Sequence, residues 1–174
     1  MPIQTEVEIS VREAGKKDIE ELISLIEEIF TEYDMDFDVD EELPDFLNYE
    51  KHYGDGGINK LFVAEHSQNG ILAGCTALKI EDDLPRLSRV YVRKKDRGKG
   101  VGKKLVGRVV EYSQSQNYSW IHLWTDTRFE RAHRFYRNMG YEYTGRVKPL
   151  GDINDSYEYH FRKYIEKNSN SFST

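Results

Sequence analysis

Apolar positions along the chain change their spacing several times, and each change predicts a new structural element. Residues 7–12 alternate between polar and apolar side chains, which favours an opening strand. From Ile19 to Tyr33 the apolar residues recur at intervals of three and four, so we expect an amphipathic helix that begins after Asp18. Two further apolar runs, 61–66 and 71–80, flank Asn69-Gly70, a pair that strongly favours a β-hairpin turn.

The second half of the chain predicts more strands, now alternating with two helices. β-Branched and aromatic residues make strands of 87–92, 120–125 and 157–164. A helix is expected from Val101 onward, where the apolar positions return to helical spacing. Another helix is expected between a capping box at 127–130 and a stop at Gly140, after which the aromatic residues from Tyr141 begin a strand.

One acidic segment, residues 32–45, fits these patterns less well. Three alternating aspartates in it match the start of a calcium-binding loop, but Val39 and Asp45 occupy the positions that require glycine and glutamate. We therefore expect a solvated acidic loop and no metal site. Apolar residues over 43–53 then predict one short helix that ends before Gly54.

Composition and charge narrow the class of protein. A chain of 174 residues with 32% charged and 13% aromatic residues fits one folded domain. The single cysteine, Cys75, excludes an intrachain disulfide and lies among small residues, so we expect a buried thiol in a reducing compartment. The chain has no long apolar run and a polar start, so we expect a cytoplasmic protein that does not span a membrane.

Charge is distributed unevenly around the net value of −6. Between Asp18 and Asp55 there are fifteen acidic residues and one basic residue, whereas 93–104 is strongly basic. Because this basic patch is short and coincides with a glycine-rich turn, it argues against nucleic-acid binding and for an anionic ligand held at one place. The acidic half would suit a cationic partner.

That glycine-rich turn, Arg97 to Gly102, has glycine at every second position between a strand and a helix. Bare backbone can approach a ligand closely, and the unpaired amides at a helix start attract anions, so the turn predicts a phosphate site. Two common phosphate loops are excluded. A nucleotide P-loop would need glycine in place of Arg97 and Ser or Thr in place of Lys104, and the dinucleotide fingerprint would need glycine in place of Lys103.

The remaining pattern, Arg97-x-x-Gly100-x-Gly102, resembles the acetyl-CoA motif of the GNAT acetyltransferase superfamily. The segment Ala132-His-Arg-Phe-Tyr-Arg-Asn-Met-Gly-Tyr141 resembles the downstream signature of the same family. The resemblance extends over roughly residues 5 to 165 and is that of a small bacterial or archaeal-type member. It implies the α/β (α+β) GNAT fold, a mostly antiparallel mixed sheet of six to seven strands with about four flanking helices. We expect one domain over 1–165 and a disordered tail over 166–174.

The resemblance also implies a reaction, direct transfer of an acetyl group from acetyl-CoA to an amine. Tyr136 matches the family tyrosine that protonates the departing sulfur. Tyr49, His52 and Tyr53 fall in a region that helps wall the acceptor site in this fold. No metal is implied. The backbone of the strand would bind the pantetheine and polarise the thioester, and the turn would hold the pyrophosphate: Val90, Tyr91 and Val92 for the former, and Arg97, Gly98, Lys99, Gly100, Val101, Gly102 and Lys103 for the latter.

The chain also departs from the family pattern. Many relatives carry an acidic residue shortly before the position of Arg89, but the chain has Arg-Leu-Ser there, so the general base stays open. Glu65 and Glu81 are weak candidates, and a water chain or a partly neutral amine could serve instead. Phe129 replaces a family asparagine that contacts CoA.

These departures keep other functions under consideration. The main alternative is a catalytically idle acyl-CoA-binding or regulatory module, and a nucleotide-binding protein is disfavoured by the failed loop matches. The acceptor is not specified by the sequence, and homodimers are frequent among similar proteins.

Overall fold

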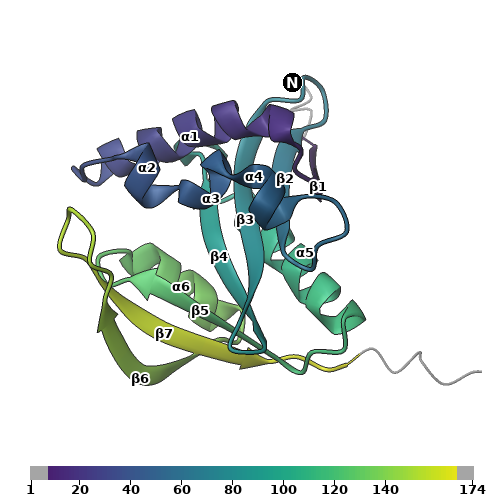
Figure 1. The fold of residues 1–174 in the computed structure, drawn as a ribbon, viewed down its shortest axis with the longest axis vertical. Helices are drawn as coiled ribbons and strands as arrows, with labels where there is room; N and C mark the ends of the chain where they lie inside the picture. The colour runs from purple at the N-terminus through teal and green to yellow at the C-terminus, as the bar shows by residue number, and fades with distance from the viewer. Residues whose placement is uncertain (1–7, 168–174) are drawn as a thin grey trace, which may run out of the picture.

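The computed structural model describes residues 8–167, and its frame is one seven-stranded sheet in the order β1-β2-β3-β4-β5-β7-β6 (Figure 1). Most of the tail expected at 166–174 lies outside the described residues. The strands match the predicted positions within a few residues, and they are β1 (Ile9–Glu13), β2 (Lys60–His66), β3 (Leu72–Glu81), β4 (Leu84–Val92), β5 (Trp120–Asp126), β6 (Glu142–Pro149) and β7 (Tyr157–Tyr164).

The pairing of β4 with β5 differs from that of every other neighbouring pair in the sheet. It is parallel, whereas the others are antiparallel, and it joins the strands at two positions, Arg86 with His122 and Leu87 with Leu123. Both strands continue beyond this point, to Val92 and Asp126, without further register between them. The sheet therefore splits in its middle, at the carboxyl ends of the two parallel strands.

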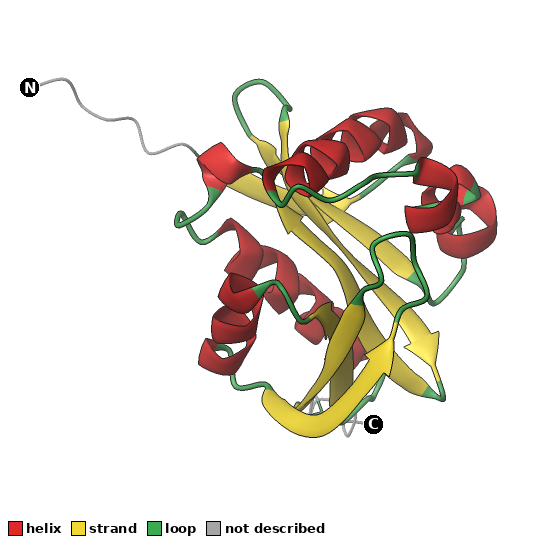
Figure 2. Ribbon diagram, turned by 90° about the vertical axis from the view of Figure 1, so that its left-hand side faces the viewer, coloured by secondary structure: helices red, strands yellow, loops and turns green. Residues whose placement is uncertain are grey.

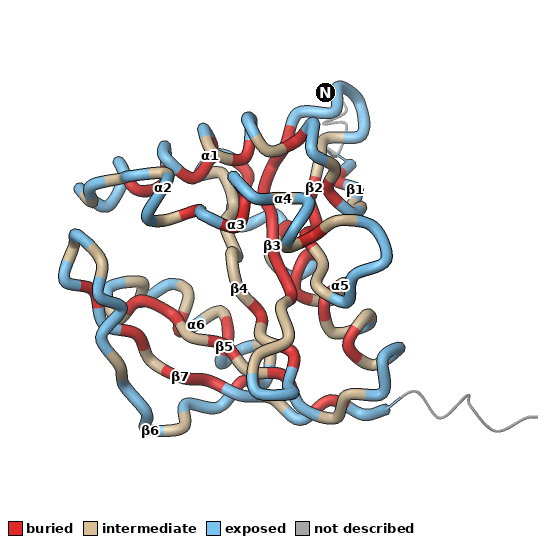
Figure 3. The backbone as a smooth tube through the Cα atoms, viewed as in Figure 1, coloured by how far each residue is buried: buried red, intermediate tan, exposed pale blue. Residues whose placement is uncertain are grey.

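Helices cover both faces of the sheet (Figure 2). On one face, α1 (Ile19–Glu32) packs through Leu22, Leu25 and Ile26 against β2 and β3. On the other face, α5 (Val101–Ser115) and α6 (Glu130–Asn138) pack against the strands through an apolar stripe that includes Leu105, Val109 and Tyr136. The buried stretches of the sheet lie mainly in β2, β3 and β5, whereas β4 is mostly of intermediate burial (Figure 3).

The single short helix expected over 43–53 is instead three one-turn helices, α2 (Val39–Glu42), α3 (Pro44–Leu47) and α4 (Tyr49–Tyr53). Pro44 starts α3 because it has no amide to donate, and Leu43 and Asn48 take non-helical backbone angles at the two breaks. With α1, α5 and α6 these make six helices in the described part of the chain, where the sequence indicated about four.

The capping box predicted at 127–130 was also wrong. The N-cap of α6 is Phe129, whose side chain caps nothing. Asp126 explains the difference, because its carboxylate accepts the amide of Arg128 at 2.8 Å and also pairs with the guanidinium of that residue. The turn before α6 is thus organised by Asp126. The stop at Gly140 was predicted correctly, and this glycine has a φ of 86°.

Candidate active site

A β-bulge in β4 shapes the open part of the sheet. Tyr91 lies opposite Cys75 and Ser88 lies opposite Ala77, so two β4 residues, Arg89 and Val90, oppose the single Thr76. Arg89 takes a left-handed φ of 56°, an unusual conformation for a residue with a side chain. Two β3 side chains support it, because Cys75 Sγ donates to Arg89 O at 3.3 Å and Thr76 Oγ1 donates to Ser88 O at 3.2 Å.

This role explains the buried cysteine that the sequence predicts. Cys75 is 0% exposed, and burial raises the pKa of its thiol to about 12. The thiol therefore stays protonated and acts as a donor to the bulge, not as a nucleophile.

The first of two cavities opens between the end of β4 and the start of α5, with a volume of about 600 Å³. Gly98 and Gly100 have φ values of 74° and 79°, and a Cβ at either position would meet no atom within 4 Å, so the backbone of the turn is bare. The first amides of α5 have no acceptor within the helix and face the same turn. Nine of the ten residues predicted to bind the donor line this cavity: Val90, Tyr91, Val92, Arg97, Gly98, Gly100, Val101, Gly102 and Lys103.

Lys99 is the exception, since its side chain is 54% exposed and does not line the cavity. Arg97 lines the cavity but holds the turn in place. It donates from Nε to Val92 O at 3.0 Å and pairs with both carboxylate oxygens of Glu32 on α1. Arg131, on α6, also lines the cavity and was not identified from the sequence. It adds a cation at the far wall.

The left-handed turn makes a testable prediction. Gly100→Ala is expected to lower stability by about 1–2 kcal/mol, because an L side chain is strained at this φ, and to weaken CoA binding. Gly107→Ala within α5 is the matched control, because a Cβ there meets nothing within 4 Å and helical alanine should stabilise by about 0.5–1 kcal/mol. Chemical denaturation and CoA titration of both variants give the two values. If Gly100→Ala and Gly107→Ala had the same stability and the same affinity for CoA, the turn would not be strained.

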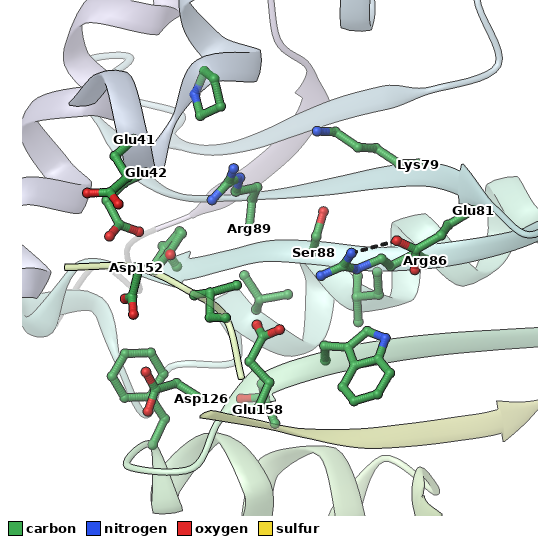
Figure 4. A pocket seen from close by; sticks show the side chains of 18 of the residues that line it. Glu41, Glu42, Lys79, Glu81, Arg86, Ser88, Arg89, Asp126, Asp152 and Glu158 are labelled. Carbon is green, nitrogen blue, oxygen red and sulfur yellow. Dashed lines mark hydrogen bonds and ion pairs between the residues drawn. The ribbon is translucent and has the colours of Figure 1, made fainter. Parts of the chain in front are cut away.

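The second cavity, of about 580 Å³, lies on the other side of the open sheet and is strongly charged (Figure 4). Its lining contains three basic residues, Lys79, Arg86 and Arg89, among acids from several parts of the chain. Those acids are Glu41, Glu42, Glu81, Asp126, Asp152 and Glu158. Most of these acids could not be recognised from the sequence because they are spread over more than a hundred residues and converge only in the fold.

The two cavities share one wall, made by Val90, Tyr91, Phe129 and Tyr136. Tyr136 is 6% exposed, and its ring packs against Tyr141 and Phe161. Burial, with smaller effects from nearby tyrosines, raises the pKa of its hydroxyl, which therefore keeps its proton at neutral pH.

The segment 32–45 was expected to be a solvated loop, but its last residue, Asp45, is buried. It is 2% exposed and accepts from Arg89 at 2.9 Å, Lys79 at 3.0 Å and the hydroxyl of Tyr53. Burial alone would raise the pKa of Asp45, but Arg89, Tyr53 and Lys79 outweigh burial and lower it to about 2. This carboxylate therefore ties the α3 segment to β3 and β4, and it stays ionised.

The tyrosines predicted to contact the substrate, Tyr49 and Tyr53, both bond to other parts of the protein. Tyr53 is buried and holds Asp45, and Tyr49 donates to Ala14 O at 2.8 Å. Neither tyrosine, nor His52, lines the charged cavity. Their positions indicate support of the cavity wall.

The two predicted base candidates are both engaged elsewhere. Glu65 accepts from Arg12 at 2.9 Å on β2 and lines neither cavity. Glu81 lines the charged cavity but accepts from Arg86 at 2.9 Å, at the end where β4 and β5 are still paired. His122, near Glu81, has Nδ1 3.1 Å from His160 Nε2, and burial lowers its pKa. Like Glu65, His122 lines neither cavity.

Within residues 8–167, no group of three or more His, Cys, Asp or Glu side chains is arranged to hold a metal ion. No helix in this range has the length and apolar character needed to cross a membrane.

A split mixed sheet with two cavities meeting at a bulged strand defines the class of protein. The family model described as an acetyltransferase (GNAT) domain matches residues 57–143, and the chain belongs to this family. An acetyltransferase of the GNAT family from Staphylococcus aureus Mu50 superposes with a TM-score of 0.77, at 26% identity over 91% of this chain and 100% of that one. An acetyltransferase from Streptococcus agalactiae 2603 shares the fold, with a TM-score of 0.75 at 23% identity over 90% and 98% of the two chains.

Curated relatives agree with this assignment. An uncharacterized N-acetyltransferase of Schizosaccharomyces pombe is 28% identical over 74% of this chain and 78% of its own length. N-acetylaspartate synthetase of Rattus norvegicus is 34% identical over 79 residues, which are 44% of this chain but only 26% of the rat protein. The chain thus spans about a quarter of that relative.

Proposed function

We propose that this protein is an N-acetyltransferase that moves an acetyl group from acetyl-CoA directly to an amine. The observation that carries the proposal is the shared wall. A bare, phosphate-compatible turn opens one cavity, a charged pocket forms the other, and Val90, Tyr91 and Tyr136 belong to both. Two substrates held in these cavities would meet there, which is what direct transfer requires.

The residues of the first cavity fit acetyl-CoA. Amides from Gly98 to Lys103 would bind the pyrophosphate at the start of α5, with Lys103 and Arg131 supplying positive charge. The backbone of Val90 to Val92, next to the bulge, would pair with the pantetheine and polarise the thioester carbonyl.

Tyr136 would act as the general acid. Its buried phenol lies on the shared wall and retains its proton at neutral pH, as needed to protonate a departing thiolate. Direct transfer needs no enzyme nucleophile, consistent with the inert Cys75.

The acceptor would be an amine that enters the charged cavity as a cation. Six carboxylate side chains and three basic ones line it, so a positively charged ammonium group is favoured. Amino acids belong among the acceptors to be tested, since the rat relative is named for N-acetylaspartate.

The test is to incubate the protein with acetyl-CoA and a panel of amines while following release of free thiol. Polyamines, aminoglycosides, amino acids and lysine-containing peptides form the panel, and mass spectrometry identifies the acetylated product. Thiol release that depends on one amine class would support the proposal. Tight CoA binding with no acetyl transfer to any amine would favour an idle acyl-CoA-binding module.

We also propose that the reaction takes place in the cytoplasm, because a buried thiol that forms no disulfide, such as that of Cys75, is typical of a reducing compartment. A homodimer is the proposed assembly, and light scattering coupled to size-exclusion chromatography tests it.

A further inference from the structure

Buried polar atoms without a hydrogen-bond partner gather in the acceptor-side cavity. Among the described residues, eight buried side-chain atoms have no such partner, and four of these belong to residues that line this one cavity. They are Glu42 Oε1, Arg86 Nε, Ser88 Oγ and Glu158 Oε2. Since native proteins rarely leave such atoms unpaired, a concentration in one cavity indicates groups kept for a ligand or for chemistry.

Most other carboxylates in and around this cavity already have partners. Asp45, just behind it, holds Arg89 and Lys79, and Asp126 is held by Arg128. Asp152 accepts both the amide and the hydroxyl of Ser156, each at 2.7 Å. Glu81 is paired to Arg86, and Glu41 is exposed. Two carboxylates with a buried, unpartnered oxygen are left to take up a proton, Glu42 and Glu158.

The two glutamates differ in their position in the cavity and in their ion pairs. The paired ends of β4 and β5 close the cavity at Arg86, and the strands open toward Asp126 and the shared wall. Figure 4 shows Glu42 and Asp152 at one end of the cavity and Arg86 with Glu81 at the other. Glu158 has Lys148 Nζ 3.9 Å from Oε2, whereas no ion pair of Glu42 occurs within residues 8–167.

The charged groups around Glu42 define its proton affinity. The pKa of Glu42 is raised to about 7, and burial is the largest cause. Repulsion by Asp152, Glu41 and Asp126 contributes to this increase, and Arg89 opposes it. Arg128, which pairs with Asp126, also interacts electrostatically with Glu42. A carboxyl group that titrates near neutral pH suits proton transfer at that pH.

We propose that Glu42 is the general base that takes a proton from the acceptor's ammonium group, an assignment that rests on the proposed acetyl transfer. Glu42 accepts one proton and leaves a neutral amine. The nitrogen lone pair forms the new bond to the acetyl carbon as the carbon–sulfur bond breaks, and Tyr136 gives its proton to the sulfur. The second proton leaving the nitrogen restores the Tyr136 hydroxyl, and Glu42 releases its proton to water.

The test compares the pH dependence of kcat/KM for wild type and Glu42→Gln, using an alkylamine whose own pKa lies well above 9. In the wild type, kcat/KM should rise with pH and level off above about 7, where Glu42 is ionised. In the variant, only the neutral fraction of the amine reacts, so kcat/KM should rise about tenfold per pH unit up to the amine pKa. At pH 7 the variant should be slower by about 10²-fold, and the two should converge at high pH.

Two further variants make the result specific. Asp40→Asn removes the same charge from the same short helix at an exposed residue that lines neither cavity, and it should keep the wild-type profile. Glu158→Gln should keep the plateau above pH 7. A plateau that persists in Glu42→Gln, or that vanishes in Glu158→Gln instead, would overturn the assignment.

Folding of the variant can be checked independently. A carboxyl group whose pKa is raised in the folded state destabilises the fold at pH values above its unfolded pKa, so Glu42→Gln should melt at or above the wild-type temperature at pH 8. If wild type transfers acetyl to no amine, the proposed function fails. If wild type is active and the Glu42→Gln profile is unchanged, only the role of Glu42 fails.

Discussion

Replacing Tyr136 with phenylalanine is expected to lower the turnover of acetyl transfer by about 10³-fold, within the usual range for loss of a general acid, while CoA binding is retained. The ring keeps its contacts with Tyr141 and Phe161, at centroid distances of 5.7 and 6.4 Å, so the core is preserved. No hydrogen bond of the phenol is found within residues 8–167, so the change removes the proton donor and little else.

Steady-state thiol release measures turnover, and calorimetric titration with CoA measures binding. Tyr141→Phe is the matched control, because Tyr141 is also buried, lies against Tyr136 and lines neither cavity. Its hydroxyl is buried without a partner in the described part of the chain, so its loss should leave turnover unchanged and should not destabilise the fold. Equal turnover of Tyr136→Phe and wild type would remove Tyr136 from the mechanism.

Asp45→Asn is expected to destabilise the fold by about 3–5 kcal/mol, the usual cost of breaking a buried ion pair by removing one partner. The variant leaves the guanidinium of Arg89, placed over the ring of Phe46, and the ammonium of Lys79 without their shared counterion. Asp55→Asn, at an exposed position, is the control and should change stability by less than about 0.5 kcal/mol. Urea unfolding at pH 7 gives both values, and similar losses for the two variants would contradict the buried ion pair.

The same carboxylate makes a pH prediction. The pKa of Asp45 is lowered to about 2 from 3.8, so its contribution is present at pH values above about 4 and is lost as the pH falls toward 2. The stability difference between wild type and Asp45→Asn should therefore shrink between pH 4 and pH 2. A difference that stays constant over that range would show that Asp45 acts through packing and not through its charge.

Much of the fold could be predicted from the sequence because its signals are local. The spacing of the apolar residues changes at each element. The turns that contain Gly70 and Gly140 each place this glycine at a positive φ, as expected for glycine in a turn. The glycine turn before α5 could be predicted in the same way, because three alternating glycines are a local pattern that does not depend on contacts with distant residues.

The charged cavity could not be predicted because its contacts join distant segments. Asp45 and Glu42 belong to an acidic stretch that suggests solvation, and only the fold brings Arg89 and Lys79 against Asp45. Local rules can also compete. The sequence at 127–130 fits a capping box, but the preceding Asp126 captures Arg128 and moves the helix start. Such competition is decided by geometry that the sequence pattern does not contain.

The split between β4 and β5 has a consequence for how the molecule avoids aggregation. Unpaired strand edges on a protein surface invite pairing with other chains. Here residues that follow Leu87 on β4 and Leu123 on β5 line the two cavities, so these strand edges are flanked by the elements that complete the cavity walls. The outer edges are β1 and β6, and both carry charged residues or proline, such as Arg12 and Pro149, which disfavour pairing with another chain. The sheet can therefore open in its middle without offering a new edge to other proteins.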